Sequence, residues 1–195
     1  MISAEYHDID KRKIAIDDRE LSARLGRVCS HTDPELFRVF EAVMQSAEPR
    51  YAVCRVPVSI SDEGTVDLGF IKTESTSLAK VLAKTGEAFV VACTLGVEVD
   101  RVIGKLSKTS RAEAFIFDAV ASAIIEAALD AVEVEIAGEC RITKRFSPGY
   151  GDLSLSCQGE ILDYLSAPLY LGVTLNDNGM MSPMKTVTAV IGIKG

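Results

Sequence analysis

The sequence has no tryptophan, only two histidines and no Gly-rich nucleotide-binding motif. With only His7 and His31 present, a histidine-ligated metal and Ser-His or Cys-His catalysis are poorly supported. The five cysteines are scattered and none forms a C-x-x-C pair, which fits neither a disulfide scaffold nor a zinc knuckle. Neither a G-x-G-x-x-G fingerprint beside a strand nor a Walker A motif is present. We therefore expect no metal site and no catalytic residue.

Basic residues are also in deficit. The chain has 21 Lys and Arg against 28 Asp and Glu, a net charge of -7, which argues against binding to duplex nucleic acid. A local basic cluster such as Lys144 and Arg145 could still hold one small anion. It contains no uninterrupted apolar run of about 18 residues, and its N-terminal stretch lacks the apolar core of a signal peptide. We therefore expect no nucleic-acid partner, no membrane association and a cytoplasmic location.

The composition that is present is that of a globular protein, with 48% hydrophobic and 25% charged residues in 195, which fits a single domain over residues 1–195. Residues 1–30 are weakly periodic and predict a short strand or helix. Thr32 and Glu35 form a capping box, and apolar residues at helical spacing predict a helix over 33–47. Alternation predicts a strand over 51–60 whose antiparallel mate is 66–71.

The remaining elements follow in the same way. We expect a helix over 75–86 that stops at Gly86, a buried strand over 87–96 and a helix over 97–108. Residues 111–138 are apolar almost all round and predict a long central helix. A short helix over 153–167 and two strands within 170–193 complete the chain. This order predicts an α+β fold with a mainly antiparallel sheet and flanking helices.

The central helix carries one polar stripe, formed by Asp118, Ser122, Glu126 and Asp130 at spacings of four residues. This spacing places the four side chains on one helix face, where like charges repel unless water or a cation separates them. Two interpretations remain open: a solvated edge of a buried helix, or an acidic wall that faces a positively charged ligand.

A second candidate is the segment ECRITKRFSPGYGDLSLSCQ, residues 139–158. Glu139 and Arg145 carry opposite charges, and the Arg145 guanidinium suits a carboxylate. Pro148 and Gly149 predict a turn that lets backbone groups approach a ligand, and Tyr150 adds a ring and a hydroxyl. The segment is either an ordinary loop or a site for a ligand with both a cation and a carboxylate, such as an amino acid or its sulfonium derivative.

The sequence RFSPGYGDLSLSCQGEILDYL, followed by LGVTLNDNGMMSPMKTVTAVIG, resembles the activation domain of cobalamin-dependent methionine synthase. That family has an R-x-x-x-G-Y element and then a GV-x-L-T-E…M-x-P…S-V-S-G segment. The resemblance is clear over 85–195 and weak over the divergent residues 1–84. It implies an α+β domain around a twisted antiparallel sheet, which binds S-adenosylmethionine.

The resemblance also implies roles for individual residues. Arg145 would pair with the methionyl carboxylate, and Glu139 would hold the cationic end of the ligand. The backbone of Phe146 and Ser147 beside Gly149 would contact the adenosine, and Tyr150 would pack beside the sulfonium. A further family acidic residue aligns nearest Ser122, with Glu126 one turn later.

By resemblance the chain is a reactivation module that supports reductive methylation of cob(II)alamin in a separate cobalamin-dependent methionine synthase, with a flavodoxin-like electron donor. It shows no homocysteine, folate or cobalamin domain, so the partner would carry the cobalamin. An accessory role for another corrinoid methyltransferase and a non-catalytic interaction module without ligand remain alternatives. The last one is motivated by residues 1–30, where the family's D-W-T-P-F-F segment with its acidic ligand contact has no counterpart. The sequence also ends short of the family's final strand and helix, so we expect a site that is open or completed by a partner.

Overall fold

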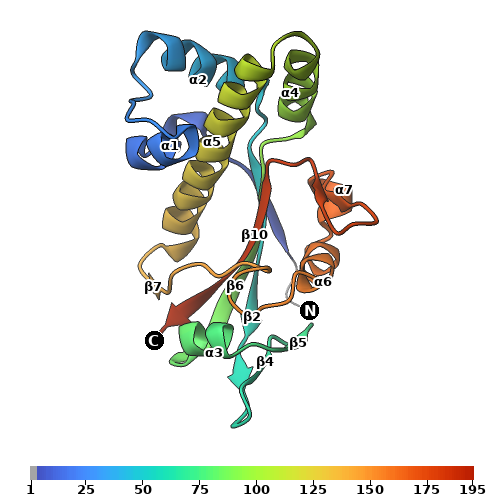
Figure 1. Cartoon of the computed structure of the whole chain (residues 1–195). Helices are drawn as coiled ribbons and strands as arrows, with labels where there is room; N and C mark the ends of the chain where they lie inside the picture. Colours follow the sequence, from blue (N-terminus) through green and yellow to red (C-terminus); the bar gives the residue numbers. More distant parts are fainter. Residues whose placement is uncertain (1–3) are drawn as a thin grey trace.

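The computed structural model describes residues 4–195 and has the predicted α+β architecture, with a five-stranded antiparallel sheet in the order β1-β2-β6-β10-β7 (Figure 1). Its long strands are β2 (Arg50–Pro57), β6 (Thr85–Thr94) and β10 (Thr186–Lys194). The short edge strands are β1 (Glu5–Asp8) and β7 (Arg141–Ile142). All pairings in this sheet are antiparallel, so the predicted fold class is confirmed.

The central strands are buried on both faces because each face contacts its own hydrophobic core. In β6, Val91 and Cys93 belong to one core and Val90 and Ala92 to the other, as the two-residue period of a strand requires. Burial raises the pKa of the Cys93 thiol, which fits a structural role for this cysteine.

Four helices cover the first face (Figure 1). They are α1 (Asp18–Leu25), α2 (Pro34–Ser46), α4 (Val97–Thr109) and the long α5 (Arg111–Ala137). Helix α5 buries twelve side chains, most of them alanine, valine or isoleucine, so the prediction of a central helix is confirmed. No helix of the described residues is long and apolar enough to cross a membrane.

The second face is covered by α3 (Thr76–Leu82), α6 (Cys157–Tyr164) and α7 (Ala167–Tyr170). Beside α3 in Figure 1, β4 (Thr65–Asp67) and β5 (Lys72–Glu74) form a small separate sheet together with β3 (Ser59–Ile60). A third sheet pairs β8 (Thr174–Leu175) with β9 (Met181–Ser182). A single-turn 3-10 helix, η1 (Lys11–Lys13), follows β1.

Three local predictions are corrected by the structure. The strand expected over 51–60 divides at Pro57–Val58: its first part pairs with β1 and β6 in the main sheet, and only β3 forms the predicted hairpin with β4. Helix α3 ends at Leu82, and Gly86 lies inside β6 and does not terminate the helix. Asp33 occupies the N-cap position of α2, but its carboxylate accepts a hydrogen bond from Ser30 N–H (3.0 Å) and none from the first turn of the helix. The predicted capping box of Thr32 and Glu35 therefore does not form.

Candidate functional site

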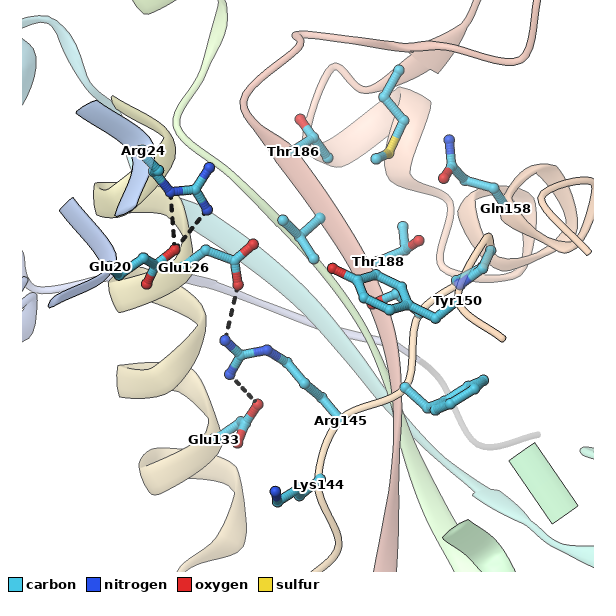
Figure 2. Close-up of a pocket in the computed structure, with 15 residues that line it drawn as sticks. Glu20, Arg24, Glu126, Glu133, Lys144, Arg145, Tyr150, Gln158, Thr186 and Thr188 are labelled. Carbon is cyan, nitrogen blue, oxygen red and sulfur yellow. Dashed lines mark hydrogen bonds and ion pairs between the residues drawn. The ribbon is translucent and has the colours of Figure 1, made fainter. Parts of the chain in front are cut away.

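A cavity of about 630 Å³ lies between helix α5, the segment that contains Arg145, and strand β10 (Figure 2). Its volume is within the range of small-molecule and cofactor sites. Helix α1 closes one side of the cavity, and Gln158 of α6 lies on the opposite side. The lining residues are Glu20, Arg24, Glu126, Glu133, Lys144, Arg145, Phe146, Ser147, Pro148, Tyr150, Gln158, Met181, Thr186, Val187 and Thr188.

Strand β10 positions the Arg145 segment. Beyond β7, Thr143 N–H donates to Gly192 O (2.9 Å), and Phe146 and Val190 exchange two backbone hydrogen bonds of 2.9 and 2.8 Å. The segment therefore runs antiparallel beside β10 and places the side chain of Arg145 between the strand and α5. This backbone pairing brings the two motifs of the sequence, Arg145–Tyr150 and Thr186–Thr188, to one cavity.

The Arg145 guanidinium bonds three carboxylates of helix α5. Its distances to Glu126 and Glu133 are 2.9 and 2.7 Å, and it also bonds Asp130. Burial by itself would lower the pKa of Arg145, but hydrogen bonds and the charges of Glu133 and Asp130 raise it above its usual value. Arg145 is thus a permanent cation that neutralises part of an acidic cluster.

A second basic side chain contacts the other end of the polar stripe. Lys185, with 8% of its surface exposed, donates to Ser122 Oγ (2.8 Å) and forms an ion pair with Asp118 (2.7 Å). The stripe predicted on the central helix is thus partly solvated, with the Asp118 and Asp130 side chains 44% and 63% exposed, and it is paired with cations from outside the helix. Arg145 and Lys185 from outside the helix supply the cations that its like charges require.

The turn that carries Tyr150 is held at its far end by Asp152. The Asp152 carboxylate accepts hydrogen bonds from Ser75 Oγ (2.5 Å), Thr76 N–H (2.8 Å) and Thr76 Oγ1 (2.7 Å), which attaches the turn to the start of α3. The side-chain hydrogen bonds from Ser75 and Thr76 hold the pKa of Asp152 well below its usual range. Gly149 has a φ of 88°, which a glycine adopts without strain and which the predicted turn requires.

The structure brings most of the predicted site residues together. Arg145, Phe146, Ser147 and Tyr150 line the cavity from the loop, and Glu126 lines it from α5. The other three predicted residues do not line it. Glu139 is exposed in the turn after α5, Ser122 is engaged by Lys185, and Gly149 shapes the turn between Pro148 and Tyr150.

Sequence reasoning missed two contributions to the cavity. Glu20 and Arg24 of α1 lie on its rim as an ion pair at 2.6 Å, and in the sequence such a pair cannot be told from any exposed helical surface. Glu133 comes three residues after the predicted stripe ends, and it lines the cavity beside Glu126. Lys144 was expected only as part of a basic cluster with Arg145 that could hold a small anion, and it also lines the cavity. A helical projection extended by one turn would have found Glu133.

The lining can hold a zwitterionic ligand but offers no metal centre. Its lining contains three carboxylates and three basic side chains, and Phe146, Tyr150 and Met181 add apolar surface. Among residues 4–195 no group of three or more His, Cys, Asp or Glu side chains is placed to hold a metal ion. The arrangement suits binding and orientation of a charged organic molecule.

Comparisons with known proteins address the fold. No protein-family model matches the sequence, and no curated protein matches it. Among solved structures, the MetH reactivation domain bound to AdoHcy is similar with a TM-score of 0.72 and 15% sequence identity, and the alignment covers 98% of this chain and 78% of that one. Because likeness at this identity establishes the fold alone, the chain has the fold of the methionine synthase reactivation domain, as its sequence motifs predicted.

Proposed function

We propose that this chain binds S-adenosylmethionine in the cavity beside α5 and acts as a reactivation module for a cobalamin-dependent methionine synthase on a separate chain. The observation that carries the proposal is the meeting of the Arg145–Tyr150 and Thr186–Thr188 motifs at one cavity, in a fold shared with a domain that binds AdoHcy. AdoHcy is the product that S-adenosylmethionine leaves after methyl transfer.

The residues present fit such a ligand. The half-buried carboxylates of Glu126 and Glu133 suit the positive charge of an ammonium or sulfonium group, and basic residues at the same cavity suit the carboxylate. Tyr150 is 65% exposed, with its hydroxyl directed into the cavity in Figure 2, so its ring is available to cover the ligand. Phe146 and Ser147 offer side-chain and backbone contacts to the nucleoside.

The role of the chain would be positional. Bound S-adenosylmethionine would supply the methyl group, and the cobalamin would be carried by the partner protein, with an electron from a flavodoxin-like donor. The side chains here hold a charged ligand in a fixed orientation at an open cavity mouth, which is what methyl transfer between two bound groups requires. No acid or base on this chain needs to move a proton.

Two measurements test the proposal. Calorimetric titration with S-adenosylmethionine and AdoHcy should show saturable binding to one site, and a Tyr150→Ala variant should bind more weakly. A reactivation assay with the cobalamin protein, a reductant and S-adenosylmethionine should regain methyl transfer faster when this chain is added. Absence of binding, both alone and with the cobalamin protein, would refute the proposal.

Two other functions remain to be separated from it. An accessory role for a different corrinoid methyltransferase would give the same ligand binding with a different client, so reactivation of that client would identify it. An interaction module without ligand is favoured by one observation: Arg145 already bonds three carboxylates of its own chain. Partner binding that is independent of S-adenosylmethionine would support this second alternative.

A further inference from the structure

Two adjacent basic residues, Lys144 and Arg145, line the cavity, but they differ in what they contact. The Arg145 side chain is 27% exposed and bonds Glu126, Asp130 and Glu133. Lys144 is exposed, and no carboxylate of residues 4–195 lies within ion-pair distance of its Nζ. Of these two neighbouring cations, Arg145 is paired with carboxylates of α5, and Lys144 is not paired with a carboxylate of the described residues.

Release of Arg145 to a ligand would be costly. The three α5 carboxylates around it would face one another without a counter-charge, in a region where Glu126 and Glu133 are 24% and 19% exposed. A half-buried carboxylate that loses its only cation keeps its desolvation penalty and loses the compensating attraction. A ligand would offer Arg145 one carboxylate, bound at best by two parallel hydrogen bonds, in place of the three carboxylates that Arg145 bonds in this structure.

The other cations near the cavity are also paired. Arg24 bonds Glu20 at 2.6 Å, and the nearly buried Lys185 bonds Asp118 and Ser122. In the part of the chain that the structure describes, Lys144 is therefore the cavity-lining basic residue without an acidic partner. Its four-carbon stem lets the ammonium group swing toward an anion without disturbing the fold.

The α5 cluster has capacity left for a cation. Arg145 uses Oε2 of Glu126 and Oε1 of Glu133, so the second oxygen of each carboxylate carries no hydrogen bond from the described residues. Three carboxylates against one guanidinium leave an excess of negative charge on this side of the cavity. In Figure 2, Lys144 lies on the loop below Arg145, at one end of this acidic surface.

We propose that Lys144 binds the carboxylate of the ligand's amino-acid end, while Arg145 stays with α5 and only supports the acidic surface that receives the ammonium group. This inference rests on the proposed function, because it assumes a ligand with an α-amino acid end. It assigns the carboxylate contact to the residue beside the one that the sequence resemblance indicates. Arg145 is then a positioning residue.

The experiment varies the protein and the ligand together. Wild type, Lys144→Met, Arg145→Lys and the exposed control Lys105→Met are titrated with S-adenosylmethionine and with its decarboxylated form, which keeps the amine and the sulfonium. We expect Lys144→Met to lower the affinity for S-adenosylmethionine about tenfold, because one charge-assisted hydrogen bond to the ligand is lost. The same variant should bind the decarboxylated ligand as tightly as wild type does, and Lys105→Met should change the affinity for neither ligand.

Arg145→Lys keeps the positive charge but loses the planar guanidinium that bonds several carboxylates at once, so the affinities for both ligands should fall by a similar factor. The inference is wrong if Lys144→Met affects the two ligands equally or not at all, or if Arg145→Lys selectively abolishes the preference for the carboxylate. If wild type binds neither ligand, alone or with the cobalamin protein, the proposed function itself fails. These outcomes separate a wrong residue assignment from a wrong function.

Discussion

Replacement of Arg145 by methionine tests whether this residue is a structural counter-ion of helix α5. Methionine keeps much of the side-chain length but removes the charge that Glu126, Asp130 and Glu133 share. Loss of one partner from a fully buried ion pair costs about 3–5 kcal/mol, and exposed pairs are worth about 0–1 kcal/mol. Arg145 is 27% exposed and lies between these cases, so we expect Arg145→Met to lower the free energy of unfolding by about 2 kcal/mol.

The assay is urea denaturation at pH 7, followed by circular dichroism. For a domain of this size the expected loss corresponds to a melting temperature lower by about 4–8 °C. Arg24→Met is the matched control, because Arg24 lines the same cavity but pairs only with Glu20, at 34% exposure for both side chains. An exposed pair of that kind should cost no more than about 0.5 kcal/mol.

A second substitution shows whether the effect is electrostatic. In wild type, Glu133→Gln removes an ion pair with Arg145 and should destabilise the fold. In the Arg145→Met background, the same change removes a repulsion between carboxylates and should be neutral or stabilising. If Glu133→Gln has the same effect in both backgrounds, or if Arg145→Met costs no more than Arg24→Met, Arg145 is not the counter-ion of this cluster.

Two further predictions concern the acid limb of stability and the turn at the cavity. A backbone hydrogen bond from His31 and a side-chain hydrogen bond from Ser30 lower the pKa of Asp18 from 3.8 to about 2, so Asp18 stabilises the fold above pH 4 and this contribution is lost as the pH falls through about 2. In urea titrations between pH 2 and 5, Asp18→Asn should therefore reduce the dependence of the unfolding free energy on pH. An unchanged dependence would contradict this prediction. At Gly151, which has a φ of 55°, an added Cβ would lie 2.8 Å from Ser77 Oγ. Gly151→Ala should therefore lower both the stability of the protein and its affinity for the ligand more than Gly26→Ala does, because Gly26 has a similar φ of 66° but open space around its Cβ position. Adding Ser77→Ala to Gly151→Ala should restore part of the loss.

The sequence determined the elements of this fold well where the signal was local. The apolar, alanine-rich stretch from 111 to 138 could only be a buried helix, and α5 spans Arg111–Ala137. Valine-rich runs predicted the buried strands β2 and β6. The hairpin was only partly right because periodicity does not specify partners: β2 pairs with β1 and β6, which lie far from it in the chain.

Several members of the site were also readable from the sequence, because the R-x-x-x-G-Y motif and the polar stripe are short-range patterns. They gave Arg145, Tyr150 and Glu126, which the structure places at one cavity. They could not give the contribution of α1, since Glu20 lies more than a hundred residues from Arg145 in the chain and meets the cavity only through packing on α5. Such contacts depend on the relative placement of elements.

The tertiary structure alone decided how the charges are used. From the sequence, Arg145 is a free cation beside a turn, and the stripe on α5 is a row of like charges. Once β10 holds residues 143–146 alongside it, the guanidinium reaches Glu126 and Glu133. The packing of α5 against β10 likewise brings Lys185 to Asp118. An ion pair requires two groups within a few ångströms, and the strand pairing that brings these groups together joins segments more than forty residues apart.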